Sequence, residues 1–170
     1  MKLCPVFLLC FPVCALQVLV TSYDGDNLFL YSADGGLVTC INLPESSKAR
    51  HAVQTVNNTF VACRTLPRHD VIEVDVLGHV IRAYSAELNW PRRLALAADG
   101  DVIVMDSSSC RVLLVDDQLR LKRILLSAEH DGLKGPWRLC YTPDNGHLVM
   151  GELWKVNEQL RGRVAVYSLI

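Results

Sequence analysis

The sequence predicts an all-β protein made of small antiparallel sheets, and three observations carry this prediction. Apolar runs of about four to eight residues alternate with Asp-Gly, Asn-Gly and Gly-Gly pairs along the 170-residue chain, which is typical of strands joined by tight hairpin turns. Long apolar patterns with the helical period are missing, and only residues 153–160 favour a helical turn or an extended loop. Finally, parts of the chain repeat one another.

Two stretches of the chain read almost alike. The first opens on Trp90-Pro91 and passes through the Asp99-Gly100 turn to an apolar run that ends in Asp106. The second opens on Pro136-Trp137 and passes through Asn145-Gly146 to a similar run. A period of about 20–50 residues indicates small structural units that cannot bury their faces alone. This architecture makes binding the default function.

Placing the repeats in register gives the strands. Gly36 and Gly78 are 42 positions apart, and Asp75 and Asp116 are 41 apart. We expect strands near 5–11, 16–22, 27–32 and 37–43; 51–56, 59–65, 70–75 and 79–84; 93–97, 101–106, 111–116 and 120–126; and 137–141, 147–151 and 163–168. Four antiparallel strands per unit are typical of a β-propeller blade.

The predicted fold is therefore a β-propeller or partial propeller of about four four-stranded blades. We expect a single domain over residues 1–170, with repeats near 5–43, 49–84, 90–126 and 136–168. The fourth repeat lacks a last strand. Propellers often fill such a gap with a strand from the other end of the chain, and the N-terminal apolar segment is the candidate here. The chain is then a small ring or a fragment of a larger one.

The N-terminal segment has two interpretations. Met1-Lys2, the apolar run 3–16 and Val13-Cys14-Ala15 fit a secretory signal that is cleaved after Ala15. The alternative is two strands of the first repeat, because Pro5 lies 86 positions before Pro91. Strands buried on both faces are continuously apolar, as this run is. We favour the strand interpretation and keep the signal as the alternative.

Composition narrows the function and the location. The chain holds 17 basic and 18 acidic residues, so no overall field favours nucleic acid or an acidic membrane. None of the seven cysteines forms a C-x-x-C pair, and no histidine follows one at zinc-finger spacing. Free thiols in a reducing compartment predict a cytoplasmic protein with no cofactor or bound metal. A cleaved signal would make the protein secreted instead.

The third repeat closely resembles an NHL repeat. It has a leading proline (Pro91), an Asp-Gly turn, an apolar strand that ends in Asp106, and an Arg-apolar strand, 111–115, followed by Asp116. The fourth repeat is similar, but Gly151-Glu152 stands where the strand-ending Asp is expected. The second repeat keeps Val74-Asp75 and Gly78 without the proline, and the first fits weakly.

The resemblance extends to the C-terminal propeller of invertebrate tripartite-motif proteins. In that family a RING finger, B-boxes and a coiled coil precede the propeller, and this chain shows no such zinc framework and no heptads. The resemblance implies a non-catalytic scaffold that binds a protein or RNA, as the substrate-recognition part of a ubiquitin-ligase-type protein. A protein partner is preferred over RNA, no membrane is involved, and open blade edges would allow self-association.

Arginines recur where the first strand of the second, third and fourth repeats begins, and tryptophans lie beside them in the third and fourth. Equivalent positions of a propeller lie on one rim, where cationic and aromatic side chains suit a protein or an RNA. The alternative is a solvated loop whose arginines pair with nearby acids. Basic residues near Arg64 and near Arg120 are expected on the solvated surface. The candidate binding residues are Arg50, His51, Trp90, Arg92, Arg93, Trp137 and Arg138.

Catalysis has little support in the sequence. Asp75, Asp106 and Asp116 follow apolar strands, where a carboxylate most often accepts hydrogen bonds from the next turn and less often holds a metal. No nucleophile elbow surrounds Ser107-Ser108-Ser109-Cys110, and phosphate-binding glycine loops are absent. We therefore expect no enzyme activity. The alternative is a secreted propeller enzyme, a metal-dependent hydrolase or lyase.

Overall fold

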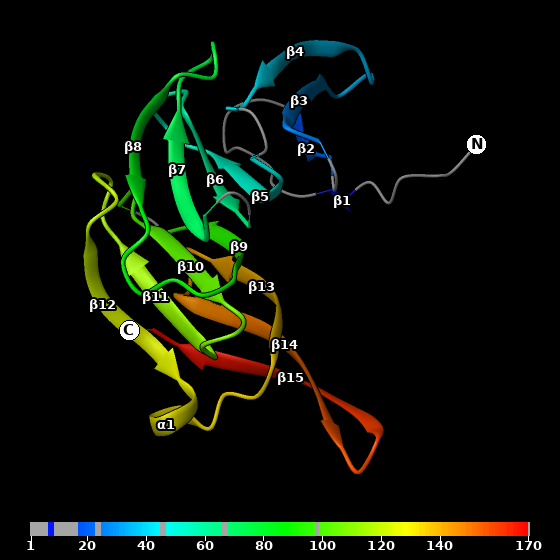
Figure 1. The fold of residues 1–170 in the computed structure, drawn as a ribbon, viewed down its shortest axis with the longest axis vertical. Helices are drawn as coiled ribbons and strands as arrows, with labels where there is room; N and C mark the ends of the chain where they lie inside the picture. The colour runs from blue at the N-terminus through cyan, green and yellow to red at the C-terminus, as the bar shows by residue number, and fades with distance from the viewer. Residues whose placement is uncertain are drawn as a thin grey trace. The chain divides into compact units, whose positions relative to one another are not determined.

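The computed structural model describes residues 7–8, 17–22, 25–44, 47–65, 68–97 and 99–169. Within these residues nearly all regular structure is β, and the chain divides into two compact units, residues 1–86 and 87–170. Each unit contains two antiparallel sheets, and the strands of every sheet follow chain order (Figure 1). The all-β prediction and the predicted number of sheets are confirmed.

The first unit holds two four-stranded sheets. Its strands are β1 (Phe7–Leu8), β2 (Gln17–Thr21), β3 (Asn27–Ser32), β4 (Leu37–Asn42), β5 (Ala49–Gln54), β6 (Phe60–Arg64), β7 (Asp70–Val74) and β8 (Val80–Tyr84). Side chains alternate between the faces of a strand, and Leu28, Leu30 and Ile41 of the first sheet are buried in a cluster with Phe60 and Ile72 of the second. These apolar faces hold the unit together.

The second unit holds one four-stranded and one three-stranded sheet. Its elements are β9 (Pro91–Leu96), β10 (Val102–Asp106), β11 (Arg111–Val115), β12 (Leu121–Ser127), α1 (Ala128–Asp131), β13 (Pro136–Thr142), β14 (His147–Val156) and β15 (Gln159–Ser168). Ile103, Met105 and Val112 pack in one cluster with Leu148 and Met150. The two sheets of this unit therefore share a core.

The N-terminal segment pairs within the first sheet. Phe7 pairs with Thr21 and Leu8 with Val20, so the described part of the segment is the strand β1 beside β2. The proposed closure strand is not observed here, because in the described chain the three-stranded sheet contains only β13, β14 and β15. The rest of the predicted strand 5–11 lies outside the described residues. That the whole chain forms one propeller stays a prediction.

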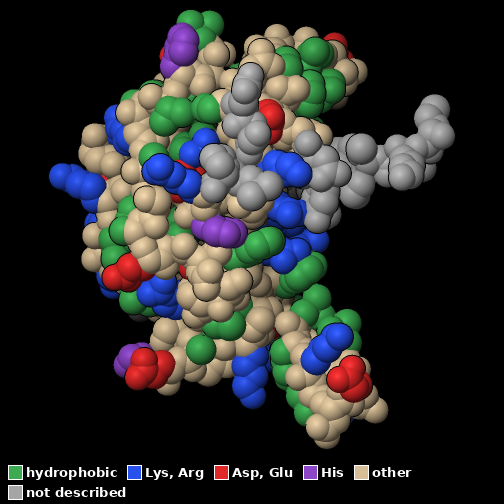
Figure 2. All heavy atoms as spheres, viewed as in Figure 1, with side chains coloured by type: hydrophobic (Ala, Val, Ile, Leu, Met, Phe, Trp, Pro, Cys, Tyr) green, Lys and Arg blue, Asp and Glu red, His purple; other side chains and the backbone are tan. Residues whose placement is uncertain are grey.

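Residues 153–160 are neither a helical turn nor a loop. They belong to a long hairpin in which β14 and β15 pair in unbroken register from His147–Ser168 to Val156–Gln159. Asn157 and Glu158 form the turn with φ of 47° and 65°, the backbone that a two-residue hairpin turn requires. The prediction was wrong because Asn-Glu lacks the glycine that marks such turns. Figures 1 and 2 show the hairpin projecting, with apolar and charged side chains along it.

Gly135 fixes how the chain enters β13. Its φ is 55°, and a Cβ at this position would lie 2.0 Å from the carbonyl oxygen of Leu153. The carbonyl of Gly135 also accepts a 2.9 Å hydrogen bond from the backbone N–H of Leu153. Only glycine fits such a close approach in the left-handed region without strain. This contact holds the start of β13 against the middle of the β14–β15 hairpin.

Candidate binding surface on β9 and β13

The two strands that carry the predicted site begin in the same way. Pro91 opens β9 and Pro136 opens β13, and both prolines are buried. Proline is tolerated at the first residue of a strand because its missing N–H removes no interior ladder bond. Strands β9 and β13 contact one another within the second unit. The residue that follows each proline therefore lies near the other strand.

Arg92 and Trp137 are those residues, and their side chains stack. The guanidinium carbon of Arg92 lies 3.3 Å from the centroid of the Trp137 ring, and that of Arg138 lies 5.7 Å from it. Both distances fall within the range of cation–π attraction. Trp137 keeps 38% of its surface exposed, although it is a large apolar side chain. We call Arg92, Trp137 and Arg138 the Trp137 surface.

The third residue of each strand repeats one backbone contact. Arg93 donates from Nη1 to the carbonyl of Arg92 at 2.8 Å, and Arg138 donates from Nη1 to the carbonyl of Trp137 at 3.1 Å. The two arginines differ in burial, because Arg93 is only 3% exposed whereas Arg138 is half-buried. Arg93 therefore lies outside the exposed surface.

The other predicted site residues are placed elsewhere. Trp90 is half-buried, and its backbone N–H donates to Asp106 at 2.6 Å. Arg50 and His51 belong to β5 of the first unit, where Arg50 donates from Nε to Thr65 at 3.4 Å and His51 is 4% exposed. The structure thus brings together Arg92, Trp137 and Arg138 of the seven candidates.

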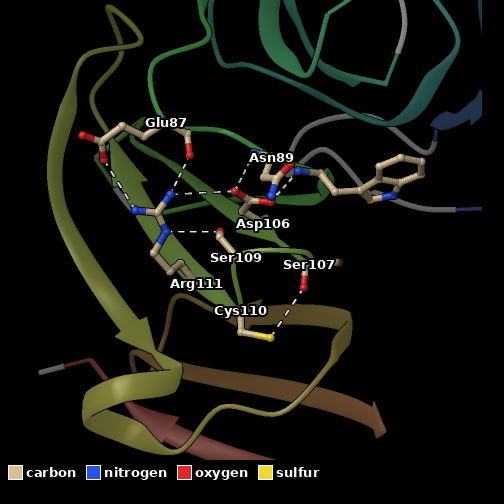
Figure 3. A network of polar contacts seen from close by, with 8 residues as sticks. Glu87, Asn89, Asp106, Ser107, Ser109, Cys110 and Arg111 are labelled. Carbon is tan, nitrogen blue, oxygen red and sulfur yellow. Dashed lines mark hydrogen bonds and ion pairs between the residues drawn. The ribbon is translucent and has the colours of Figure 1, made fainter. Parts of the chain in front are cut away.

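A buried carboxylate positions the start of β9. Asp106 ends β10 with no exposed surface, and its carboxylate accepts the backbone N–H groups of Asn89 at 2.9 Å and Trp90 at 2.6 Å (Figure 3). Arg111 lies beside it, with Nη2 4.0 Å from Oδ2 of Asp106. We call Asp106, Arg111 and the two backbone N–H groups the Asp106 clasp.

Arg111 is itself held in place from both sides. Its Nη2 donates to the carbonyl of Glu87 at 2.5 Å and its Nε donates to Ser109 at 3.1 Å, and Nη1 lies 3.5 Å from the Glu87 carboxylate (Figure 3). Charge-assisted hydrogen bonds of this kind fix geometry more tightly than neutral ones. The Asp106 clasp therefore fixes the segment that leads to Pro91 and Arg92.

The three-stranded sheet contains the same clasp with a glutamate. Glu152 is 1% exposed, accepts the backbone N–H of Lys134 at 2.6 Å, and pairs with Arg163 at 2.7 Å. The Glu152 hydrogen bond raises the pKa of Arg163. In register Glu152 stands opposite Arg163, as Asp106 stands opposite Arg111. The apparent departure from the repeat at Gly151-Glu152 is thus a one-carbon-longer carboxylate in the same place.

The β5–β8 sheet contains the pair with its charges reversed. Arg64 ends β6 and Asp70 begins β7, and they form two hydrogen bonds, of 2.7 and 2.5 Å. Arg64 also donates to the hydroxyl of Ser47, which precedes β5, at 3.1 Å. At 9% exposed, Arg64 is not the solvated surface residue that its sequence context suggested. The repeat pattern in the sequence did not reveal the Arg64–Asp70 pair, because the basic and acidic residues are exchanged relative to the other repeats.

Two of the strand-ending aspartates organise turns, as predicted. Asp116 accepts the backbone N–H groups of Gln118 at 2.9 Å and Arg120 at 2.7 Å, and Asp75 does the same for Leu77 and His79. The hydrogen bond from the Arg120 backbone is the main cause that lowers the pKa of Asp116. Asp106 differs, because it reaches back to the start of β9.

Metal sites and membrane-spanning helices are both absent from the described residues. There, no three His, Cys, Asp or Glu side chains gather closely enough to hold a metal ion. The same residues include no helix long and apolar enough to cross a membrane. Within the described part of the chain, Cys40, Cys63, Cys110 and Cys140 form no disulfide bond. Among the predicted binding residues, those of the Trp137 surface are the ones that the structure brings together.

Comparison with known proteins shows the fold. No family model matches the chain, and no curated protein matches its sequence. Among solved structures, a streptogramin B lyase matches with a TM-score of 0.66 and 14% identity over 95% of this chain and 54% of its own. The WD40 β-propeller domain of Doa1 matches with a TM-score of 0.66 and 16% identity over 94% of this chain and 50% of its own. The chain has a β-propeller fold.

A third match is Chaetomium thermophilum Raptor, with a TM-score of 0.65 and 13% identity over 91% of this chain and 14% of its own. At such low identities the likeness establishes the fold alone. The chain spans about half the length of the lyase and of the Doa1 propeller domain.

Proposed function

We propose that this chain is a non-catalytic binding scaffold that presents the Trp137 surface to a protein partner. The observation that carries the proposal is a partly exposed tryptophan beside two arginines, with guanidinium carbons 3.3 and 5.7 Å from the ring centroid. Tryptophan and arginine are the side chains most enriched among residues that dominate binding energy. The stack also orders both side chains before binding, which lowers the entropic cost of association.

The chemistry of the surface favours an acidic segment in the partner. Arg92 and Arg138 present guanidinium groups, and each can bind a carboxylate through two parallel hydrogen bonds. Trp137 offers an apolar face on which an aliphatic or aromatic side chain can pack. RNA is the other occupant of such a surface, because bases stack on tryptophan and phosphates bind arginine. We favour the protein because the whole chain carries a net charge of −1.

More specifically, we propose that the chain is an NHL-type propeller that serves as the substrate-recognition part of a ubiquitin-ligase-type protein. Its support is the sequence of the third repeat, from Pro91 through the Asp99-Gly100 turn to Asp106 and Arg111. The structure adds the reason for two of these residues, since Asp106 and Arg111 form the clasp that positions the start of β9. The same clasp recurs at Glu152 and Arg163.

A secreted propeller enzyme is the second candidate, and one observation favours it. The similar structures include a streptogramin B lyase and a virginiamycin B lyase from Staphylococcus aureus, which matches with a TM-score of 0.60 at 13% identity. A mature N-terminus at Leu16 together with a stoichiometric divalent ion in the purified protein would support this candidate against the scaffold. A chain that retains Met1 and binds no metal would support the scaffold.

The binding test starts from a peptide library. Twelve-residue random peptides displayed on phage are selected on the immobilised chain, and one selected peptide is then titrated by fluorescence anisotropy. We expect peptides rich in Asp, Glu and aromatic residues. The double variant Arg92→Glu, Arg138→Glu should weaken binding about 100-fold, since truncating residues central to an interface typically costs 2 kcal/mol or more.

The matched control changes the same charge elsewhere in the same unit. Arg123 and Arg161 are exposed, on β12 and β15, so the variant Arg123→Glu, Arg161→Glu should bind the peptide as the wild type does. Peptides that bind all three proteins equally would remove the Trp137 surface from the proposal. Binding of poly(U) that depends on Arg92 and Arg138, with no selected peptide, would assign the surface to RNA.

A further inference from the structure

A β-bulge lies at the start of both strands that carry the Trp137 surface. The register of β9 with β10 passes over Arg92. The register of β13 with β14 includes Pro136 and Arg138 but passes over Trp137 between them. A bulge leaves its extra residue outside the ladder and re-aims the side chain of that residue. The direction of the Trp137 side chain therefore depends on contacts other than the ladder.

Ser107 supplies one such contact. It directly follows Asp106, the last residue of β10, in the turn that Figure 3 shows. Its hydroxyl donates to the carbonyl of Pro136 at 2.9 Å. This carbonyl belongs to the peptide unit that joins Pro136 to Trp137, and a peptide unit is planar. The Ser107 hydroxyl thus fixes the peptide plane that enters Trp137.

The peptide plane that leaves Trp137 is held as well. Its carbonyl, which is that of Trp137, accepts a hydrogen bond from Nη1 of Arg138 at 3.1 Å. The orientations of its two flanking peptide planes set the backbone dihedrals of a residue, and hence the direction of its Cα–Cβ bond. Ser107 and Arg138 together therefore aim the indole ring.

The backbone of Ser107 is itself anchored on both sides. Its N–H donates to the carbonyl of Trp90 at 3.0 Å, and its carbonyl accepts the N–H of Cys110 at 3.4 Å. The neighbouring carboxylate of Asp106 accepts the N–H of Trp90 at 2.6 Å. The start of β9 and the start of β13 are thus joined through two consecutive residues. This link sets the spacing of the two strands that carry the stack.

The three-stranded sheet separates the backbone part of this link from the hydroxyl part. There Leu153 follows Glu152 as Ser107 follows Asp106, and its N–H donates to the carbonyl of Gly135 at 2.9 Å. The backbone hydrogen bond therefore recurs where the side chain has no hydroxyl, so it belongs to the repeat. The hydrogen bond from the Ser107 hydroxyl is additional, and it reaches from one sheet to the next.

We propose that Ser107 is a positioning residue of the Trp137 surface, a role that rests on the binding function proposed above. Its hydroxyl holds the peptide unit before Trp137, so that the indole ring is stacked on Arg92 before a partner arrives. A side chain that is ordered in advance loses less conformational entropy on association. Ser107 thus contributes to affinity through Trp137.

The first test measures the ring itself and needs no ligand. In the background Trp90→Phe, Trp154→Phe, Trp137 is the one tryptophan left of three, and acrylamide quenching of its fluorescence reports its exposure. Arg92 covers part of the ring, with its guanidinium carbon 3.3 Å from the centroid. Ser107→Ala removes the hydroxyl, so the ring should leave this stack and its quenching constant should rise.

Peptide titration in the otherwise unchanged chain separates positioning from stability. Ser107→Ala should weaken binding of a peptide selected on the wild type about fivefold, which corresponds to the loss of one hydrogen bond. A role in stability alone would lower the urea midpoint and leave the affinity of the folded protein unchanged.

Two variants in the same turn serve as controls. Ser107→Thr keeps the hydroxyl and should restore both the affinity and the quenching constant, since Thr65 occupies the equivalent position after β6. Ser108→Ala makes the same chemical change at the neighbouring, exposed serine. It should leave affinity and quenching as they are in the wild type.

Equal quenching constants for Ser107 and Ser107→Ala in the single-tryptophan background would overturn the positioning role, whether or not a peptide is selected. A lower urea midpoint with unchanged quenching would overturn it in the same way and leave Ser107 a structural role. A raised quenching constant with unchanged peptide affinity would keep Ser107 as the residue that positions Trp137. That result would instead contradict the proposed function, because the peptide would bind elsewhere.

Discussion

Arginine has different roles in two regions of the second unit, the Asp106 clasp and the Trp137 surface. In the Asp106 clasp, Arg111 lies beside a carboxylate with no exposed surface and donates to Glu87 and Ser109. In the Trp137 surface, Arg92 stacks on an aromatic ring that is 38% exposed. Arg111 completes a buried polar network. Arg92 instead lies near the surface, against a tryptophan ring that is partly exposed.

This difference distinguishes arginines that stabilise the fold from arginines that are available to bind a partner. A buried carboxylate that loses a partner leaves an uncompensated polar group, which destabilises the protein. An exposed guanidinium on a ring contributes about 0.5–1 kcal/mol to stability and more to recognition once water is excluded. The two regions should therefore respond oppositely to substitution, one in unfolding and the other in binding.

The largest expected effect is at Asp106. Asp106→Leu removes the acceptor of two backbone N–H groups, at 2.9 and 2.6 Å, and leaves Arg111 without its buried partner. We expect a loss of about 3–5 kcal/mol in unfolding free energy. Urea unfolding followed by tryptophan fluorescence measures it, because Trp90, Trp137 and Trp154 all lie in the second unit. A loss below about 1 kcal/mol would contradict the clasp.

The Arg64–Asp70 pair in the first unit tests whether the order of the charges matters for stability. Arg64→Asp alone places two carboxylates together where Asp70 is 3% exposed, and we expect a loss of about 3–5 kcal/mol. Adding Asp70→Arg restores an ion pair with the polarity of the other sheets, and should recover at least about half of the loss. Circular dichroism in a urea series follows the three proteins. A double variant no more stable than Arg64→Asp would show that the polarity of this pair is fixed by its surroundings.

A smaller effect is expected at Glu152. Glu152→Gln keeps an oxygen that can accept the backbone N–H of Lys134 but removes the charge that pairs with Arg163. The side chain of Arg163 is 43% exposed, so solvent screens the pair and the expected loss is about 1 kcal/mol. The same fluorescence measurement compares it with Asp106→Leu. A loss equal to that of Asp106→Leu would contradict the screening of the Glu152–Arg163 pair by solvent.

The smallest effect is a pH dependence at an exposed turn. Hydrogen bonds, first from the backbone of Arg120, hold the pKa of Asp116 below its ordinary value. This carboxylate therefore stabilises the fold above the unfolded pKa, about 3.9, and its contribution is lost as pH falls through the lower folded pKa. Asp116→Asn should flatten the acid side of the stability profile below pH about 4. Identical profiles of the two proteins would contradict the assigned hydrogen bonds.

Much of the fold could be predicted from the sequence because its signals are local. Short apolar runs beside Asp-Gly turns located strands such as 101–106, which is observed as β10, and Gly100 adopts the positive φ of 81° that such a turn needs. The β14–β15 hairpin was missed because its turn, Asn157-Glu158, has no glycine. The helix Ala128–Asp131 was missed because one turn is too short to show a period.

The candidate site was predicted only in part, and the reason is physical. Equivalent repeat positions suggested that Arg92 and Trp137 belong together, and their contact follows from the packing of β9 on β13. That Arg93 and His51 are buried depends on tertiary packing, which the pattern of one strand does not contain. The charge pairs were hidden because Arg64 and Asp70 exchange the order found in Asp106 and Arg111.

The most direct test of the account is Trp137→Ala, measured in two ways on one preparation. Titration with a peptide selected on the wild-type chain should show binding at least about 30-fold weaker, equivalent to 2 kcal/mol. Urea unfolding of the same variant should show a loss of no more than about 1 kcal/mol, since Trp137 is partly exposed. Unchanged peptide binding, or a loss of stability as large as that of Asp106→Leu, would contradict a surface held ready for a partner.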